Sequence, residues 1–187
     1  MNTRDLVGNP DQFYPTPKEA VDPLLPHLIE GRKRGDYRSV IDPCAGRGDL
    51  LHHLFPVGFR SMIGYEIALK IAEHRLAGCQ VCLADGLAEL AETDTDTRST
   101  LIIANPPFTG DSWHVWARAM HRYQYALILL PNTVLSAASH IAVLDEVQGQ
   151  PRFLRRRVAF TGSTPSWGCA WWDIGQDIAV PMEGAFL

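Results

Sequence analysis

The sequence contains few cysteines and no long hydrophobic run, and it has no excess of positive charge. Only four of its 187 residues are cysteine, and the single Cys-x-x-Cys spacing, Cys79 to Cys82, has no second pair to complete a zinc site. We therefore interpret both side chains as small buried hydrophobic groups. No apolar run approaches the roughly 20 residues that a membrane span requires, so we expect no membrane partner.

The beginning of the chain lacks a signal for export. Residues 1–5 do not show the basic and then apolar pattern of a signal peptide, so we expect a cytoplasmic protein. Hydrophobic residues make up 46% of the sequence and charged residues 20%, which is the composition of a soluble globular protein. A chain of this length favours one domain over residues 1–187, in which residues 1–12 lack periodicity and form a flexible arm.

The charge balance excludes one class of nucleic-acid-binding protein. A net charge of −4 does not suit a protein that coats nucleic acid through charge alone. The positive residues are nevertheless clustered, in one group at residues 32–38 and in a second that comprises Arg152, Arg155, Arg156 and Arg157. Each group is either a solvated surface or, if the partner is nucleic acid, a set of phosphate contacts.

The hydrophobic pattern predicts an α/β fold. Short apolar strands alternate with helical segments, and such units form a parallel sheet with helices on both faces. After residue 151 two strands follow each other without a helix, which predicts an antiparallel hairpin at the edge of the sheet. We predict strands at residues 39–42, 62–65, 81–84, 101–104, 125–130, 153–160 and 169–174. We predict helices at residues 17–30, 48–55, 67–76, 86–91, 112–121 and 136–147.

The first predicted helix has a sequence signal at its start. Thr16 followed by Pro17 and Glu19 is typical of a capping box, with Thr16 as the N-cap and a proline at the first helical position. Pro23 and Pro26 lie within the predicted helix, and we expect them to distort it.

The stretch Asn105-Pro106-Pro107-Phe108 follows the apolar run of residues 101–104. Two consecutive prolines fix φ and remove two N–H donors, so the segment cannot continue a helix or pair inside a sheet. The result is a rigid turn with a side-chain amide at one end and an aromatic ring at the other, which suits a flat ring that carries an amino group. From these four residues alone, the alternative is a strand that ends in a proline turn, with Phe108 in the core.

Polar residues stand at the ends of four successive predicted strands. The first strand leads into a turn with Gly46 and Gly48, which let the backbone pass close to a ligand. The second ends at Glu66, 20 residues after Gly46, where an acid suits the two hydroxyl groups of a ribose. The third ends at Asp85, which is able to accept a hydrogen bond from an adenine amino group. The fourth ends at Asn105, and right-handed crossovers place all four ends on one edge of the sheet.

With this arrangement the chain resembles the S-adenosylmethionine-dependent amino-methyltransferases, specifically the adenine-N6 DNA methyltransferases. Residues 42–48 are similar to their glycine-rich cofactor loop, and residues 105–108 are similar to their Asn/Asp-Pro-Pro-aromatic catalytic motif. Residues 13–17 are similar to the segment that precedes the fold in many of them, and this motif order matches the gamma arrangement. The resemblance covers residues 13–108. It implies a Rossmann-like class I methyltransferase fold with a seven-stranded, mostly parallel sheet.

The resemblance also implies roles for individual residues. The Asn105 side-chain oxygen and the Pro106 carbonyl would accept hydrogen bonds from the target amino group, and Phe108 would stack on the target base after it has left its helix. S-adenosylmethionine would give up its methyl group by direct displacement without a metal, leaving S-adenosylhomocysteine. The implied catalytic residues are Asn105, Pro106, Pro107 and Phe108. The implied cofactor-binding residues are Tyr14, Thr16, Asp42, Cys44, Ala45, Gly46, Gly48, Glu66, Ile67, Asp85, Gly86 and Asn105. The residues expected to bind the substrate are Phe108, Arg155, Arg156, Arg157, Phe160 and Trp167.

Two alternative functions remain beside methylation of adenine in DNA. The same four-residue motif also occurs in enzymes that methylate an RNA base amine or a glutamine amide of a protein. A catalytically silent, cofactor-binding subunit is the second alternative, although the intact motif at residues 105–108 argues against it. Pro43-Cys44 mimics the Pro-Cys pair of cytosine-C5 methyltransferases, but its place in the glycine loop favours a packing role for Cys44.

Target recognition is expected to be limited. Between Phe108 and the C-terminal hairpin no stretch is long enough for a separate target-recognition domain, and direct reading of base pairs requires an element in the major groove. We expect nucleic acid, DNA in the first place, as the partner. The sequence preference is expected to be short, nearly absent, or supplied by a protein partner or by self-association. We interpret Trp113 and Trp116 as packing residues. The histidines at positions 52, 53, 74, 114, 121 and 140 are expected at surfaces or interfaces.

Overall fold

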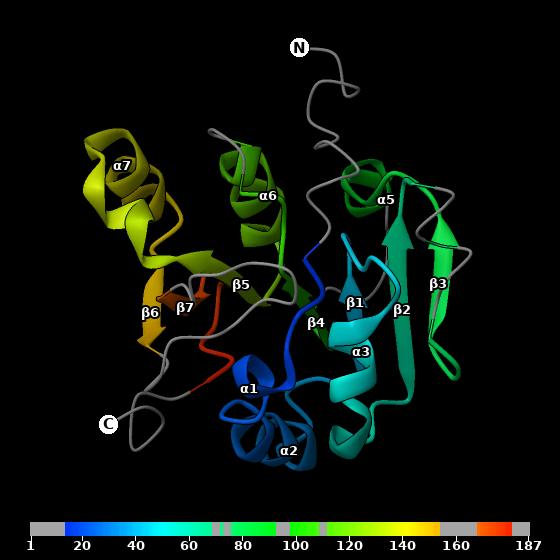
Figure 1. Ribbon diagram of the computed structural model, residues 1–187. Coiled ribbons are helices and arrows are strands. Elements are labelled where there is room, and N and C mark those ends of the chain that lie inside the picture. Colours follow the sequence, from blue (N-terminus) through cyan, green and yellow to red (C-terminus); the bar gives the residue numbers. More distant parts are fainter. Residues whose placement is uncertain are drawn as a thin grey trace.

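A seven-stranded sheet between two layers of helices forms the body of the protein (Figure 1). The computed structural model describes residues 14–68, 72, 76–92, 98–108, 112–153 and 168–180. In this part of the chain the strands stand in the order β3-β2-β1-β4-β5-β7-β6. The predicted fold class, an α/β fold with a mostly parallel sheet and a C-terminal antiparallel hairpin, is confirmed.

The direction of the strands determines where their ends meet. The first five strands pair in parallel, whereas β7 runs antiparallel to both of its neighbours. Their bounds are β1 (Ser39–Asp42), β2 (Ser61–Glu66), β3 (Gln80–Leu83), β4 (Thr100–Ala104), β5 (Tyr125–Pro131), β6 (Gln150–Phe153) and β7 (Cys169–Asp173). The segments that follow β1, β2, β3 and β4 therefore meet at one edge of the sheet, which we call the carboxyl edge.

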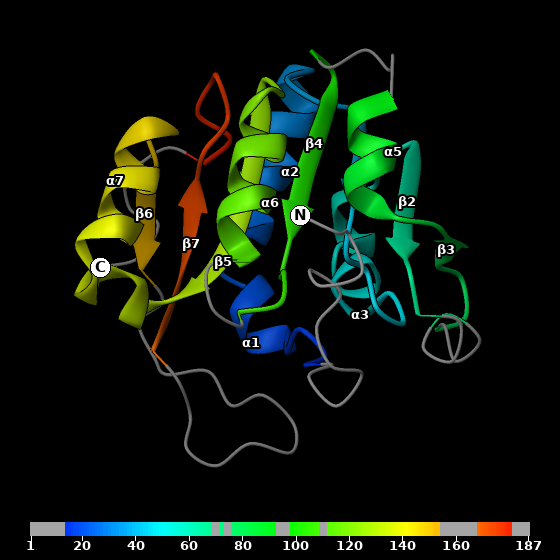
Figure 2. The ribbon, with the colours of Figure 1, turned by 90° about the horizontal axis from the view of Figure 1, so that it is seen from above.

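Helices cover both faces of the sheet (Figures 1 and 2). One face carries α1 (Lys18–Val21), α2 (Leu25–Arg34) and α3 (Asp49–His53), and the other carries α5 (Gly86–Glu92), α6 (Ser112–His121) and α7 (Ala138–Glu146). Two single-turn helices, η3 (Phe55–Val57) and η4 (Asn132–Ser136), follow α3 and β5. The predicted helix over residues 67–76 lies mostly outside the described residues. None of the helices in the described part of the chain has the length and apolar character needed to cross a membrane.

Two apolar cores, one on each face of the sheet, explain the positions of the central strands. Every residue of β4 and β5 is buried, as expected for strands that are covered on both sides. Along β4, Leu101 and Ile103 join the core on the side of α1, α2 and α3, whereas Ile102 and Ala104 join the core on the side of α5, α6 and α7. This alternation is the two-residue period of a strand.

The prediction of one helix over residues 17–30 is wrong. α1 ends at Val21, and α2 begins at Leu25 after a turn that contains Pro23. The break has a physical reason, because a proline in a helix interior removes a hydrogen bond and clashes with the preceding turn. The predicted capping by Thr16 is also wrong, since Pro17 occupies the N-cap position and no side chain caps α1.

The C-terminal hairpin borders the sheet and holds the first helix. β6 begins at Gln150 rather than at residue 153, and residues 154–167, which include the rest of the predicted strand, lie outside the described residues. On β7, Trp171 and Trp172 are buried in opposite cores. The indole N–H of Trp171 donates a 2.7 Å hydrogen bond to the carbonyl of Ala20 in α1, so α1 is anchored in the core.

Arg152 is neither the solvated surface residue nor the phosphate contact that the sequence analysis considered. Its side chain is 2% exposed, its Nε donates to the carbonyl of Val180 at 2.8 Å, and its guanidinium lies 3.8 Å from the carboxylate of Asp173. A charge that is buried in this way requires a fixed partner. Arg152 therefore joins β6 to the segment after β7.

Candidate active site

The loop after β1 is the turn around which the carboxyl edge is built. Gly46 and Gly48 have φ angles of +57° and +90°, a conformation that other residues rarely adopt, so these two glycines allow the chain to turn from β1 into α3. The N–H of Ala45 donates to the carbonyl of Tyr65 at 2.9 Å, which ties the loop to β2.

Two further glycines are required because the loop packs directly on them. A Cβ atom at Gly64 would lie 2.5 Å from the Cβ of Ala45, and one at Gly86 would lie 1.8 Å from the carbonyl oxygen of Pro43. Gly86, predicted as a cofactor contact, thus lies against the loop at the start of α5. Gly64 was missed by the sequence analysis, although a glycine inside a strand is itself a sign of close backbone approach.

Glu66 at the end of β2 binds the glycine loop through its carboxylate. Oε2 accepts a 3.1 Å hydrogen bond from the N–H of Gly46, and Oε1 accepts one of 2.7 Å from the N–H of Ala68. Burial raises the pKa of this carboxyl, and hydrogen bonds from the backbone N–H groups of Ala68, Gly46 and Ile67 oppose that rise. A carboxylate has about four lone-pair sites, so Glu66 keeps acceptor capacity beyond these hydrogen bonds. Glu66 is therefore equipped to bind hydroxyl groups.

Asp85 follows β3 and stands at the beginning of α5. Its Oδ1 accepts hydrogen bonds from the N–H groups of Leu87 at 3.0 Å and Ala88 at 3.5 Å, so the carboxylate caps the first turn of the helix. Within the described residues, no hydrogen bond uses its Oδ2. Ile67, which follows Glu66 at the neighbouring strand end, is 43% exposed, so an apolar side chain is available beside the two acids.

Asp42, the last residue of β1, is a buried acid at the centre of the carboxyl edge. Its Oδ1 accepts a 3.1 Å hydrogen bond from the N–H of Cys44. Burial raises the pKa of Asp42 to about 7, while the hydrogen bond from Cys44 opposes the rise and the charge of Glu66 adds to it. Strongly shifted pKa values are concentrated at functional sites, so this carboxyl supports a functional role for the edge.

The thiol of Cys44 connects the loop after β1 with the turn after β4. Its pKa is raised well above the ordinary value by burial first and then by the charge of Asp42, and a hydrogen bond from the backbone N–H of Asn105 opposes the rise. A thiol of this kind is protonated at neutral pH and is a poor nucleophile. Cys44 also packs against the core on the side of α6, which agrees with the packing role expected for it.

The Asn105 side chain, directly after β4, has two ends with different surroundings. Its Nδ2 donates to the hydroxyl of Thr16 at 3.0 Å and to the carbonyl of Tyr14 at 3.2 Å. Its Oδ1 is buried and has no hydrogen-bond partner among the described residues. Buried acceptors in folded proteins are nearly always paired, so an unpaired one calls for an explanation. The simplest is that a bound molecule supplies the missing donor.

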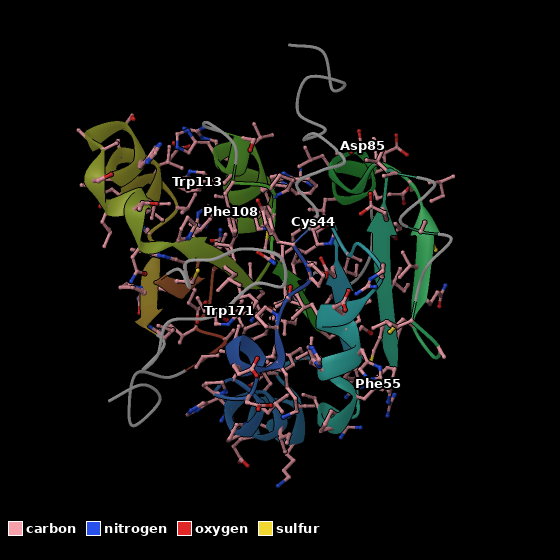
Figure 3. All side chains as sticks on the ribbon, in the orientation of Figure 1. Cys44, Phe55, Asp85, Phe108, Trp113 and Trp171 are labelled. Carbon is pink, nitrogen blue, oxygen red and sulfur yellow. The ribbon has the colours of Figure 1, made fainter. Side chains whose placement is uncertain are left out.

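The remainder of the motif forms a fixed turn. Ser112 at the start of α6 donates from its hydroxyl to the carbonyl of Pro107 at 2.9 Å, which holds the turn on that helix. Phe108 is partly buried and packs against the core on the side of α6, whereas Trp171 lies on the side of α1 (Figure 3). Phe108 therefore packs on the core, as one alternative expected, and it remains partly accessible, so its contact with a substrate stays a prediction.

Most of the predicted site residues meet at the carboxyl edge, and the others lie outside the described residues. The residues at the carboxyl edge are Asp42, Cys44, Ala45, Gly46, Gly48, Glu66, Ile67, Asp85, Gly86, Asn105, Pro106, Pro107 and Phe108, and Tyr14 and Thr16 join them through Asn105. The predicted substrate contacts Arg155, Arg156, Arg157, Phe160 and Trp167 lie outside the described residues. The roles of all these residues stay predictions.

The predictions about aromatic side chains on α6 had different outcomes. Trp113 and Trp116 are buried, which confirms a packing role. His114, expected at a surface or interface, is instead buried inside the domain, with its ring centroid 4.3 Å from that of Trp113 and 5.1 Å from that of His140 on α7. In the part of the chain that the structure describes, no three potential metal-binding side chains lie together.

Comparison with known proteins identifies the fold through solved structures. No protein-family model matches the sequence, and a search of curated proteins finds no match either. Among solved structures, a candidate class I S-adenosylmethionine-dependent methyltransferase from Listeria monocytogenes matches with a TM-score of 0.68 and 14% identity, over 94% of this chain and 65% of its own. The modification subunit of a candidate type I restriction enzyme from Vibrio vulnificus matches with a TM-score of 0.53 and 17% identity, over 98% of this chain and 50% of its own.

A third solved structure matches over most of both chains. This candidate RNA methyltransferase from Pyrococcus horikoshii has a TM-score of 0.63 and 15% identity, over 89% of this chain and 87% of its own. The chain therefore has the Rossmann-like fold of class I methyltransferases, as predicted. It spans 65% and 50% of the lengths of the Listeria and Vibrio proteins.

Proposed function

We propose that this chain transfers a methyl group from S-adenosylmethionine to an exocyclic amino group, the N6 group of adenine in DNA. The observation that carries the proposal is the Asn105 amide, whose NH2 end is bound by the protein and whose buried oxygen has no partner among the described residues. Leaving a buried acceptor unpaired costs about 1–3 kcal/mol. An amino group of a substrate would supply the missing donor.

The carboxyl edge offers groups that fit the methyl donor. Ligands of Rossmann-like sheets bind at this edge, and S-adenosylmethionine supplies an electrophilic methyl group there when it is bound. Gly46 and Gly48 let the backbone approach its methionine part beside Asp42, the remaining lone pairs of Glu66 suit its ribose hydroxyls, and Oδ2 of Asp85 suits its adenine amino group. We propose Cys44, Ala45, Ile67 and Gly86 as the other residues around it, with Tyr14 and Thr16 covering it through apolar contacts, since the Tyr14 carbonyl and the Thr16 hydroxyl bind Asn105.

On the target side, two oxygens would hold the amino group. Oδ1 of Asn105 and the carbonyl of Pro106 each accept one N–H hydrogen bond, which draws the nitrogen lone pair out of conjugation with the ring. With the cofactor bound, the amino nitrogen would take the methyl group from the sulfonium sulfur, and the proton that the nitrogen gives up would pass to solvent. Positioning and fixed acceptors supply the rate. Phe108 would stack on the extruded base, a contact worth ~1–3 kcal/mol.

Adenine in DNA is the preferred substrate within this chemistry. The resemblance of residues 13–17 and 105–108 to adenine-N6 DNA methyltransferases supports it, and one protein of similar fold is the modification subunit of a candidate restriction enzyme. Another is a candidate RNA methyltransferase, so an RNA base amine is the second candidate and a protein glutamine amide the third. We propose that the chain is one domain and that its target is short, or that a protein partner or a second copy supplies recognition. We further propose that the substrate is contacted by Arg155, Arg156, Arg157, Phe160 and Trp167.

Methyl transfer to DNA, RNA and protein, measured side by side with radiolabelled cofactor and followed by nucleoside analysis, tests the substrate. We expect N6-methyladenine in DNA in many sequence contexts. If the label were found only in RNA or only in protein, that molecule would replace DNA as the proposed substrate. Binding of S-adenosylmethionine without any transfer would favour a silent subunit, and one long, strict site in sequenced DNA would contradict the short target.

The role of Asn105 is tested separately from cofactor binding. Asn105→Ala should lower methyl transfer by about 100- to 1,000-fold, the effect of losing a preorganised hydrogen-bonding group, and leave S-adenosylmethionine affinity nearly unchanged. Gln80, an exposed amide at the start of β3 and so at the opposite edge, provides the control Gln80→Ala, which should retain activity. Loss of cofactor binding in the Asn105 variant would place the amide in the cofactor site instead.

A further inference from the structure

We infer that the hydroxyl of Thr16 and the carbonyl of Tyr14 orient the Asn105 amide so that only its oxygen is presented to the target. We call this pair of hydrogen bonds the Tyr14/Thr16 contact. Thr16 is in this sense a positioning residue, which acts through Asn105 and needs no contact with the substrate. The inference rests on the proposed function, because it concerns the same site.

The Tyr14/Thr16 contact selects one of the two orientations of the amide. Nδ2 of Asn105 has an acceptor for each of its hydrogens, at 3.0 Å and 3.2 Å. The Tyr14 carbonyl is able only to accept, so the opposite orientation would set the Asn105 oxygen against it and remove the hydrogen bond that it accepts from Nδ2. The amide is therefore held with its nitrogen toward Tyr14 and Thr16 and its oxygen away from them.

The backbone around Asn105 is fixed as well. Its N–H is hydrogen bonded to the thiol of Cys44, and the following Pro106 restricts Asn105 to extended conformations. Further along the turn, the carbonyl of Pro107 accepts the hydroxyl hydrogen of Ser112 at 2.9 Å. The remaining freedom is rotation of the Asn105 side chain, and the Tyr14/Thr16 contact removes it.

The segment that makes this contact is itself anchored in the core. Thr16 is 5% exposed, and Pro17 leads directly into α1, where Ala20 and Val21 are completely buried. Trp171 of β7 donates to the carbonyl of Ala20 at 2.7 Å. The anchors hold Thr16 against the end of β4, although 89 residues separate it from Asn105 in the sequence.

An amide held in this way is able only to accept a hydrogen bond from the substrate. It favours an amino group, which has N–H donors to offer, and it repels ring nitrogens and carbonyl oxygens, which are acceptors. The Tyr14/Thr16 contact should therefore contribute to turnover and to the choice of target atom, and not to cofactor affinity.

Thr16→Val tests the contact, because it removes the hydroxyl and keeps the branched shape of the side chain. We expect kcat for methyl transfer to fall about tenfold, the size of one hydrogen bond, with the Kd for S-adenosylmethionine nearly unchanged. Thr16→Ser restores the hydroxyl and should recover most of the activity. Thr100→Val is the matched control, since Thr100 is equally buried but stands at the opposite end of β4.

Three results would overturn the inference. The first is an unchanged kcat in Thr16→Val. The second is a loss confined to the Kd for S-adenosylmethionine, which would make Thr16 a cofactor contact. The third is an equal loss of kcat in Thr16→Val and Thr100→Val, which would reflect a general loss of stability, and a thermal unfolding curve for each variant would show it directly.

The orientation of the amide is also measurable without turnover, which separates this inference from the proposed function. In 15N-labelled protein, the side-chain NH2 signal of Asn105, identified by its absence in Asn105→Ala, should exchange slowly with solvent and faster in Thr16→Val. Slow exchange together with no methyl transfer to any substrate would keep the Tyr14/Thr16 contact and reject the proposed function. Fast exchange in the wild-type protein would reject the contact even if methyl transfer is found.

Discussion

The two halves of the carboxyl edge satisfy their polar groups in different ways. In the cofactor half, at the ends of β1, β2 and β3, the carboxylates of Asp42, Glu66 and Asp85 accept hydrogen bonds from backbone N–H groups of the adjoining loops. In the target half, at the end of β4, the Asn105 amide donates to Tyr14 and Thr16 and keeps an unpaired oxygen.

The two halves also differ in the sequence separation of their contacts. The hydrogen bonds of the cofactor half join residues two or three positions apart, with one that spans 20 positions, whereas those of the Asn105 side chain span 89 and 91. The cofactor half therefore depends mainly on contacts within its own strand–helix units. The target half depends on the position of the distant segment around Thr16.

The largest expected effect disrupts the cofactor half. Gly86→Ala would place a Cβ atom 1.8 Å from the carbonyl oxygen of Pro43, which is backbone and has no rotamer to change. We expect the free energy of unfolding to fall by about 3 kcal/mol or more, the upper end of overpacking, and S-adenosylmethionine binding to be lost with it. Urea unfolding and calorimetric titration would measure the two effects.

A second glycine provides the control for Gly86. At Gly35, φ is +89° and nothing lies within 4 Å of an added Cβ atom, so Gly35→Ala should cost only the strain of a left-handed alanine, about 1–2 kcal/mol. Cofactor binding should survive in this variant. Equal losses of stability at the two positions would show that the loop after β1 does not depend on its contact with Gly86.

The next largest effect is expected in the target half. Asn105→Asp keeps an oxygen in place and removes both donors, so the carboxylate is repelled by the carbonyl of Tyr14. We expect methyl transfer to fall about 100-fold, which corresponds to about 2.7 kcal/mol, with cofactor affinity unchanged. Initial rates of methyl transfer at saturating cofactor would measure this loss. Turnover close to wild type would mean that the orientation of the amide is unimportant.

Local patterns were sufficient to predict most of the fold and the cofactor half. The five parallel strands begin and end within one residue of their predicted bounds, because a buried apolar run between turn residues has few alternative structures. Glu66 and Asp85 could be assigned to one edge for the same reason, since parallel strands end on the same side of their sheet. Gly46 and Gly48 were recognisable because a tight strand-to-helix turn requires positive φ.

Contacts between distant segments could not be predicted in this way. Thr16 has the sequence of an N-cap, yet Pro17 occupies the cap position and the Thr16 hydroxyl accepts a hydrogen bond from Asn105 instead. Arg152 stands near three other arginines in the sequence, yet it pairs with Asp173 in the interior. A run of charges does not show which face a strand residue occupies until the register is known, and a shift of one residue reverses the face.

A smaller effect is expected from Glu66→Gln, which should weaken cofactor binding and leave methyl transfer unchanged, the reverse of Asn105→Asp. The variant keeps one oxygen for the N–H of Gly46 or Ala68 and loses the charge and the second acceptor. We expect the Kd for S-adenosylmethionine to rise about tenfold, equal to about 1.4 kcal/mol, with kcat at saturating cofactor unchanged. Calorimetric titration and initial rates separate the two quantities. A lower kcat at unchanged affinity would assign Glu66 to the target half.

Asp42 and Asp173 are two buried acids with different surroundings. Asp173 lies 3.8 Å from Arg152 and accepts a 3.0 Å hydrogen bond from the N–H of Val180, and burial still raises its pKa to about 6. Burial raises the pKa of Asp42 to about 7, and the charged group that acts on it among the described residues is another acid, Glu66. Keeping such an acid without a cationic partner lowers stability, which is typical of a residue retained for function.

The smallest expected effect is that of Asp42→Asn, which should stabilise the folded protein above neutral pH and weaken S-adenosylmethionine binding. Because the pKa in the folded state, about 7, is above the ordinary 3.8, the folded protein keeps a proton that the unfolded chain has released between these values. The stability of the wild type relative to the variant is therefore greatest below about pH 4, falls as the pH rises to about 7 and stays low above it. Between about pH 4 and about pH 8, urea unfolding should show the free energy of unfolding of the variant rising by about 1 kcal/mol relative to that of the wild type. This is less than the full ~1.4 kcal/mol per pKa unit because a buried site relaxes. Burial also raises the pKa of Asp173, so its pH dependence has the same direction. Asp173→Asn should nevertheless be less stable than the wild type at both pH values, since it leaves Arg152 without its charge partner. A loss of stability at both pH values in Asp42→Asn as well would mean that Asp42 is a structural acid.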